Sequence, residues 1–170
     1  MREMNVSNVI HKIRRIRERD ELERCARLMS ESDPWKRLYF SYDQCFDSLS
    51  RPDIEVYGAW AVSEFRGFLA SLAVGISSEP LLEYVCIDAE HRGQGVGSEL
   101  ITYFEEVLFP DADNLYLFVS DINPEAIRLY VRLGYLCVGA LPNYNITSQT
   151  EFLHRKSRRP KQAPHRDASA

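Results

Sequence analysis

The sequence predicts a single α/β domain, and three observations lead to this prediction. The chain has 170 residues, 45% of them apolar and 27% charged, which is a globular composition able to fill one core. Segments with strand periodicity alternate with segments of helical periodicity. Within residues 83–98, an apolar strand runs directly into a glycine-rich turn that opens a helix.

The N-terminal part of the chain predicts one strand followed by two helices. Apolar residues among basic ones at residues 9–16 indicate an edge-like strand. Asp20 can cap a helix whose apolar stripe continues to residue 29. After a break at residues 32–35, apolar residues recur at helical spacing over residues 42–49 and predict the second helix.

The remainder of the chain predicts three strands, a helix, a strand, a helix and two strands. The first two of these strands form a hairpin signal, because residues 63–66 separate two segments rich in aliphatic and aromatic residues. Proline and glycine mark the helix ends. The predicted elements are strands at 54–62, 67–74 and 81–87, a helix from about 95 to 108, a strand at 115–120, a helix between Asn123 and Gly134, and strands at 135–141 and 152–153.

Several protein classes are disfavoured by composition. No window has the roughly 18 apolar residues of a membrane span, and the first residues lack the apolar core of a secretion signal. Cys25, Cys45, Cys86 and Cys137 lack the paired spacing of a metal or redox site, so we expect buried thiols and no metal. A cytoplasmic protein is therefore expected.

The charge is distributed unevenly along the chain. The formal net charge is −4, but residues 28–153 contain 19 acids against 7 Lys and Arg. An acidic body favours a cationic partner such as an amine over nucleic acid, although a solvated surface explains the same pattern. Residues 155–170 are basic and predicted to be a disordered tail, either a solubilising segment or a contact for RNA or an acidic partner.

The glycine-rich turn predicts a phosphate site. Glycines allow backbone N–H groups to approach an anion, and the N-terminus of the following helix favours negative charge. Arg92 adds a cation at the mouth of the turn. A dinucleotide fingerprint would need glycine where Ser98 stands, and a P-loop would need a lysine that this turn lacks.

Two motifs resemble those of the GNAT superfamily of acetyl-CoA-dependent N-acetyltransferases. Residues 92–97, Arg-Gly-Gln-Gly-Val-Gly, match its acyl-CoA signature. Residues 123–135 match its second signature, whose tyrosine is Tyr130 in this chain. The element order agrees over residues 10–154, and the N-terminal part resembles an uncharacterised prokaryotic branch. The resemblance implies a GNAT domain at residues 1–154, with a mixed, mostly antiparallel twisted sheet of about seven strands and helices on both faces.

The resemblance also assigns the acetyl-CoA contacts. The strand at 81–87 would pair its backbone with the pantetheine arm and splay from the strand ending at Ser120, so that a main-chain N–H polarises the acetyl carbonyl. Asn123 would bond the coenzyme or cap its helix, and both options stay open. The implied cofactor-binding residues are Val85, Cys86, Ile87, Arg92, Gly93, Gln94, Gly95, Val96, Gly97, Ser98, Asn123 and Tyr130.

Two residues are candidates for proton transfer. Tyr130 occupies the position of the family's general acid and would protonate the departing thiolate, unless its ring only packs in the core. Glu83 is the candidate base, on the expectation that it shares a strand face with Val85 and Ile87; a salt-bridged Glu83, with water as the base, is the alternative.

The acceptor side is expected near the two N-terminal helices and the last loop. Trp35, Tyr39, Tyr42 and Tyr144 are the candidates, because aromatic faces beside acids suit a cationic amine, and core packing is their alternative role. Whether Glu151 binds substrate or pairs with Arg155 is left open.

The resulting hypothesis is acetyl transfer from acetyl-CoA to a primary amine by direct attack in a ternary complex. The acceptor would be a small amine or a protein N-terminus. The rival is a non-catalytic acyl-CoA-binding sensor or interaction module, and a nucleic-acid role ranks third. The oligomeric state stays open, with a dimer among the options.

Overall fold

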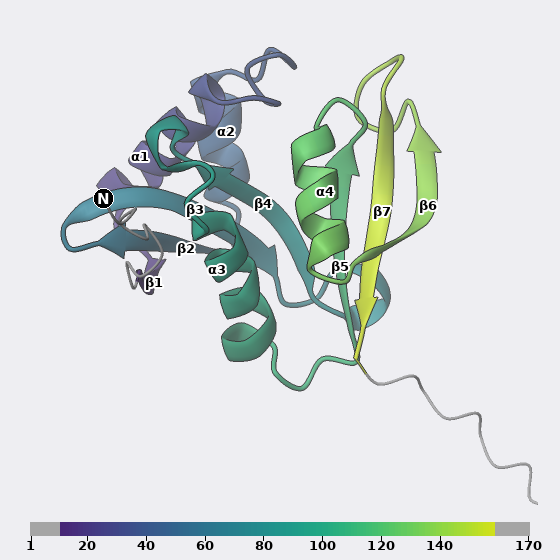
Figure 1. Ribbon diagram of the computed structural model, residues 1–170. Coiled ribbons are helices and arrows are strands. Elements are labelled where there is room, and N and C mark those ends of the chain that lie inside the picture. Colours follow the sequence, from purple (N-terminus) through teal and green to yellow (C-terminus); the bar gives the residue numbers. More distant parts are fainter. Residues whose placement is uncertain (1–10, 159–170) are drawn as a thin grey trace, which may run out of the picture.

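A seven-stranded sheet with helices on both faces forms the domain (Figure 1). The computed structural model describes residues 11–158. The strand order is β1-β2-β3-β4-β5-β7-β6, and every neighbouring pair is antiparallel except β4 and β5. The elements are β1 (Lys12–Ile16), α1 (Arg19–Glu31), α2 (Tyr42–Leu49), β2 (Ile54–Ala61), β3 (Glu64–Leu72), η1 (Ile76–Ser78), β4 (Leu81–Ile87), η2 (Ala89–His91), α3 (Val96–Tyr103), η3 (Phe104–Leu108), β5 (Asn114–Ser120), α4 (Pro124–Arg132), β6 (Leu136–Pro142) and β7 (Thr150–Ser157).

This order and fold class confirm the sequence prediction. The helix predicted from about residue 95 to 108 is α3 continued by the π-helical turn η3. α2 begins at a capping box, in which Ser41 and Gln44 bond each other's backbone N–H groups, and this arrangement satisfies two otherwise unpaired donors. α4 starts at Pro124 and ends before Gly134, which has φ +93°.

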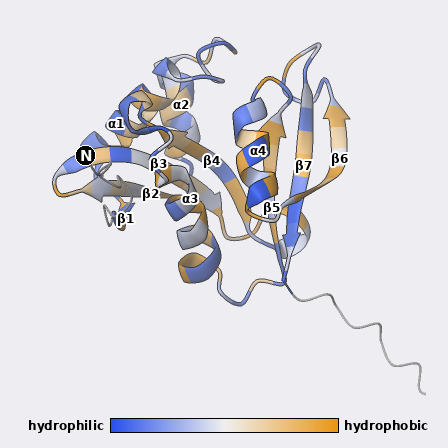
Figure 2. Ribbon diagram, viewed as in Figure 1, coloured by the Kyte–Doolittle hydropathy of each residue, from blue (hydrophilic) through white to orange (hydrophobic). Residues whose placement is uncertain are grey.

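Two apolar cores lie on opposite faces of the sheet. One core packs α3 and α4 against residues such as Leu82, Leu117 and Val119. The other packs α1 and α2 against residues such as Phe68 and Cys86. Figure 2 shows apolar residues along β5, whereas the outer surface of α4 is hydrophilic. The two cores hold the sheet between layers of helices and fix the ends of β4 and β5.

Three details differ from the sequence prediction. β7 continues through Ser157, beyond the predicted domain end at residue 154, because Lys156 bonds Glu105 beneath the sheet. The basic tail predicted from residue 155 therefore starts inside a strand; residues 159–170 lie outside the described residues. Cys137 is exposed, since β6 is an edge strand with little cover. Among residues 11–158, no helix has the length and apolar content needed to cross a membrane.

The junction of β4 and β5 is the irregular part of the sheet. The two strands pair only at Leu81 with Tyr116 and at Leu82 with Leu117. Beyond Leu82, β4 continues alongside β3, while β5 continues alongside β7. The register of β4 against β3 also shifts at Glu83, which forms a bulge. The strands therefore separate beyond the junction and leave backbone of β4 unpaired on that side.

Candidate active site

A cavity of about 760 Å³ opens where β4, the glycine turn and α4 meet. Residues from elements far apart in the sequence line it, so it is a product of the fold. The structure brings most of the predicted cofactor residues together here. The predicted residues that line it are Trp35, Val85, Cys86, Ile87, Arg92, Gly93, Gly95, Val96, Gly97, Ser98, Asn123 and Tyr130.

The glycine turn presents the uncapped start of α3 to this cavity. Gly93 and Gly95 have φ of +73° and +90°, in the left-handed region that favours glycine. The first backbone N–H groups of a helix have no intrahelical partners, and no side chain caps those of α3. These groups and the helix dipole make this end of the cavity suitable for a phosphate.

Two polar side chains brace the turn from within. The Arg92 Nε donates a hydrogen bond to the Ile87 carbonyl oxygen at 3.2 Å. The Gln94 side-chain amide donates to the Glu90 carbonyl oxygen at 2.8 Å, and Gln94 is the residue of the predicted turn that does not line the cavity. The turn is therefore held by its own side chains, while its backbone faces the cavity.

The last residues of β4 form one wall. Val85 and Ile87 pack toward α3 and α4, whereas Cys86 packs on the opposite core. Burial raises the pKa of the Cys86 thiol to about 12, so this sulfur is protonated at neutral pH. Cys86 is thus an apolar wall residue, and the unpaired side of β4 lies next to the separation from β5.

Tyr130 lies on α4, is 8% exposed as a residue and lines the cavity. The ring packs edge-to-face on Tyr135, with 6.1 Å between centroids. Burial raises the pKa of Tyr130 to about 12, and the phenol keeps its proton at neutral pH. Tyr130 therefore packs in the core, which is its alternative role, and it is also a protonated residue in the lining of the cavity.

Asn123 caps α4. Its side-chain oxygen accepts a hydrogen bond from the backbone N–H of Ala126 at 3.2 Å. This is one of the two roles left open by the sequence. The residue also lines the cavity, so the capping role leaves a contact with a ligand open.

Glu83 lies outside the cavity and pairs with Arg51. The Glu83 Oε1 and Arg51 Nη1 atoms are 3.4 Å apart, which is the salt-bridged alternative. Glu83 does not share a face with Val85, because the bulge breaks the alternation: Leu82 and Val85 both pack toward α3, and Tyr84 packs toward α2. The expected shared face is therefore wrong, and the carboxylate reaches toward the end of α2.

The aromatic acceptor candidates are dispersed. Trp35 lines the cavity and packs edge-on to Tyr84. Tyr39 is 92% exposed, and Tyr42 stacks on Phe46 within the helical layer. Tyr144 stacks on Phe118 of β5, with 5.7 Å between centroids. Among the four, only Trp35 borders the cavity, and Tyr42 has the packing role given as its alternative.

The sequence places the chain in a family of known enzymes. Residues 14–135 match the model of the acetyltransferase (GNAT) family. The chain belongs to the GNAT family. An uncharacterized protein of Mycobacterium leprae is 28% identical over 132 residues, covering 73% of this chain and 34% of that protein. The GNAT chain thus spans about a third of this curated relative.

Solved GNAT structures share the fold. A GNAT-family protein from Desulfovibrio desulfuricans has a TM-score of 0.70 at 14% identity, with 87% of this chain and 99% of that chain covered. An aminoglycoside 6'-N-acetyltransferase complexed with coenzyme A has a TM-score of 0.67 at 20% identity, covering 89% and 99%. The spermidine/spermine N-acetyltransferase from Vibrio cholerae has a TM-score of 0.64 at 18% identity, covering 86% and 92%.

Cationic residues at the cavity of this GNAT domain were missed by the sequence analysis. Arg37 precedes α2, and Arg128 and Arg132 lie on α4; all three line the cavity. The signal for the last two is their spacing of four residues, which puts both on one face of a helix. They add positive charge around a space whose other end is the uncapped N-terminus of α3.

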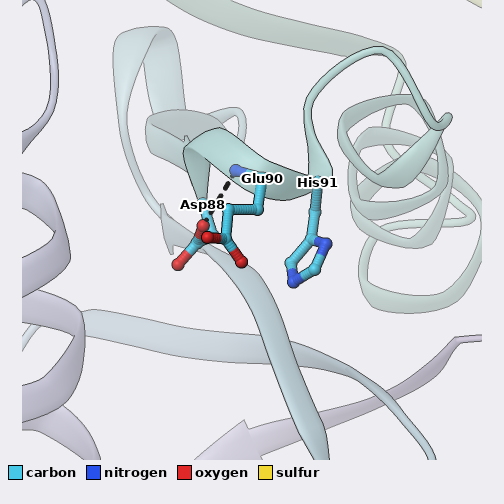
Figure 3. A group of neighbouring side chains, drawn as sticks. All are labelled: Asp88, Glu90 and His91. Carbon is cyan, nitrogen blue, oxygen red and sulfur yellow. Dashed lines mark hydrogen bonds between the residues drawn. The ribbon is translucent and has the colours of Figure 1, made fainter.

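Asp88, Glu90 and His91 lie together beside the turn of this GNAT domain, close enough for three ligand atoms to surround a metal ion (Figure 3). Their contacts indicate a structural role. The Asp88 carboxylate accepts a hydrogen bond from the Glu90 backbone N–H at 3.0 Å. The His91 ring contacts Arg66 and lies 3.2 Å from a Glu64 oxygen. These partners account for Asp88 and His91 without a metal ion.

Proposed function

We propose that this GNAT domain transfers an acetyl group from acetyl-CoA to a primary amine, either a small molecule or a protein N-terminus. The observation that carries the proposal is the cavity itself. It joins an uncapped helix N-terminus, the unpaired side of β4 and a buried, protonated tyrosine in one space. These features suit a pyrophosphate, an extended pantetheine arm and a leaving thiolate, respectively.

The cofactor contacts follow from these positions. The N–H groups at the start of α3 would bind the pyrophosphate, with Arg92 nearby and Arg128 and Arg132 supplying further positive charge. Backbone groups of Val85, Cys86 and Ile87 would pair with the pantetheine arm, because β5 leaves that side of β4 free. A main-chain N–H there would polarise the thioester carbonyl.

The chemical step is direct attack in a ternary complex. The amine lone pair forms a bond to the carbonyl carbon, the carbon–sulfur bond breaks, and the sulfur leaves with the bonding electrons. Tyr130 gives its proton to that sulfur. The proton lost by the amine goes to water as the base, the alternative given for a salt-bridged Glu83, since the Glu83 carboxylate is held by Arg51 outside the cavity.

Release of coenzyme A tests this function. The wild-type protein is mixed with acetyl-CoA and a panel of amines that includes monoamines, diamines and peptides with free N-termini. We expect release above the acceptor-free rate with at least one member, and a mass increase of one acetyl group on that acceptor. Calorimetry showing no acetyl-CoA binding by the protein contradicts the proposal.

Tyr130→Phe separates an enzyme from a non-catalytic acyl-CoA sensor. Phenylalanine keeps the ring packing on Tyr135 and removes the transferable proton. We expect acetyl-CoA affinity to stay within about twofold and turnover to fall by roughly a hundredfold, in the range of general acid catalysis. Unchanged turnover rules out Tyr130 as the acid, and a wild type that binds acetyl-CoA without turnover on any acceptor favours the sensor.

A further inference from the structure

Glu151 is a buried acid without a cationic partner in the part of the chain that the structure describes. Its residue is 7% exposed in β7, and among residues 11–158 no Lys, Arg or His lies within ion-pair distance. The other buried acid among residues 11–158, Glu105 of η3, is paired with Lys156. Burying a carboxylate without a counter-charge is unfavourable, and such groups are often retained for function.

The register of β5 and β7 places a second unsatisfied polar group opposite it. Ser120 pairs with Glu151 across the two strands, and directly opposed residues share a face. Ser120 is 6% exposed, and its hydroxyl oxygen is buried with no hydrogen-bond partner in the described part of the chain. A buried hydroxyl without a hydrogen-bond partner therefore lies directly opposite a buried carboxylate without a counter-charge.

This pair points away from α4. The residues that alternate with it, Val119 and Phe152, pack into the core beneath α3 and α4. Phe118 lies on the same face as Ser120, two residues earlier, and its ring stacks on Tyr144. We call Phe118, Ser120, Tyr144 and Glu151 the β5–β7 cluster. It combines a carboxylate, a hydroxyl and aromatic faces on one side of the sheet.

The cluster lies next to the proposed acetyl site. Ser120 is the last residue of β5, at the end that separates from β4, and Ile122 and Asn123 just beyond it line the cavity. Arg155 is four residues from Glu151 in an extended strand, roughly 13 Å along the chain, and makes no ion pair with it within the structure. Of the two roles left open for Glu151, substrate binding is therefore the one that the arrangement favours.

We propose that Glu151 and Ser120 bind a second, non-reacting ammonium group of the acceptor, which is therefore a diamine or polyamine. This inference rests on the proposed acetyltransferase function. A buried carboxylate favours the protonated form of an amine beside it, whereas the attacking nitrogen needs a free lone pair. The group at Glu151 is thus a different nitrogen from the one acetylated. The ring faces of Phe118 and Tyr144 suit the methylene chain between the two nitrogens.

The pKa of Glu151 is consistent with a carboxylate that binds a cation. Burial raises the pKa of Glu151, the Asn145 and Ser120 side chains lower it, and the nearby Asp121 carboxylate raises it again. A bound ammonium group supplies the positive charge that favours the ionised carboxylate.

The test compares putrescine with butylamine, which share a four-carbon chain and differ in the second amine. The wild type is compared with Glu151→Gln, which has the same shape without the charge. We expect the ratio of kcat/KM for putrescine to that for butylamine to fall at least about tenfold in the variant, because one charged hydrogen bond is lost. An unchanged ratio overturns the proposal, and so does an equal loss with both amines.

Binding and stability provide readouts that do not depend on turnover. By calorimetry on the protein saturated with coenzyme A, Glu151→Gln should weaken putrescine binding about tenfold; equal affinity overturns the inference even if no amine is acetylated. Glu151→Gln should also unfold at no lower temperature than the wild type, because a buried charge is removed.

Ser120→Ala provides a second variant with a smaller loss in the same direction, and Asp111→Asn, an exposed acid at the other end of β5, is the matched control. Failure of the acetyltransferase proposal is recognised separately, by a wild type that releases no coenzyme A with any amine.

Discussion

Gly95 shows how one residue connects sequence to chemistry. Its left-handed conformation lets the chain leave η2 and enter α3 without a side chain over the uncapped N–H groups. A Cβ at Gly95 would meet no atom closer than the Glu99 Oε1 at 4.0 Å, so space is not the constraint. The backbone conformation is the reason for glycine here.

Gly95→Ala should therefore destabilise the protein by about 1 kcal/mol and weaken acetyl-CoA binding about tenfold, because relief of the strain moves the turn. Gly134→Ala is the matched control: Gly134 has φ +93°, its Cβ would have similar space, and it lies outside the cavity. Thermal unfolding and calorimetry measure both variants. Equal acetyl-CoA affinity for the two would contradict a binding role for the turn.

At the scale of elements, the last strand is fastened to the helical layer by a buried ion pair. Lys156 of β7 bonds Glu105 of η3, whose side chain is 6% exposed, and Arg158 lies 3.9 Å from the same carboxylate. The partners are 51 residues apart in sequence. This pairing explains why the folded domain extends past residue 154.

Lys156→Met should lower the free energy of unfolding by about 3 kcal/mol, because it leaves the Glu105 charge buried with only the more distant Arg158. Urea denaturation measures the change. The double variant Lys156→Met with Glu105→Leu should recover most of the loss, since it removes the unpaired charge. If the double variant is less stable than Lys156→Met alone, desolvation of Glu105 is not the cause.

The elements that could be predicted from sequence are those with local signals. Periodicity, Pro124 and the glycines located the helices and strands, and two motifs correctly predicted that Tyr130 and the turn at 92–98, apart from Gln94, line one cavity. The partner of Glu83 could not be predicted, because the β4 bulge has no distinctive sequence and changes which face each residue occupies. Glu151 lacked a predictable role because its burial depends on the pairing of strands from different parts of the chain.

For the molecule as a whole, buried tyrosines lower the free energy of unfolding as the pH rises into the alkaline range. Burial raises the pKa of both Tyr57 and Tyr130 from 10.0 to about 12. Below pH 10 both are protonated in the folded and unfolded states. Between pH 10 and 12 the unfolded chain releases protons that the folded protein retains, so stability falls as the pH rises.

We therefore expect the free energy of unfolding to decrease across this range, and Tyr130→Phe to reduce the slope by up to about 1.4 kcal/mol per pH unit. Guanidinium denaturation at several alkaline pH values gives the two slopes. Parallel curves for the wild type and the variant would show that Tyr130 does not stay protonated in the folded state.

The two registered pairs between β4 and β5 also bear on which acyl groups this fold can accept. Because no backbone ladder spans the strands beyond Leu82 and Leu117, side chains rather than ladder spacing set the width of the gap there. Under the proposed function, a larger or smaller side chain at Val85 would thus alter the acyl chain length that fits while the sheet keeps all its pairings. The donor selectivity of the proposed acetyltransferase would then change by single substitutions, without a change of architecture.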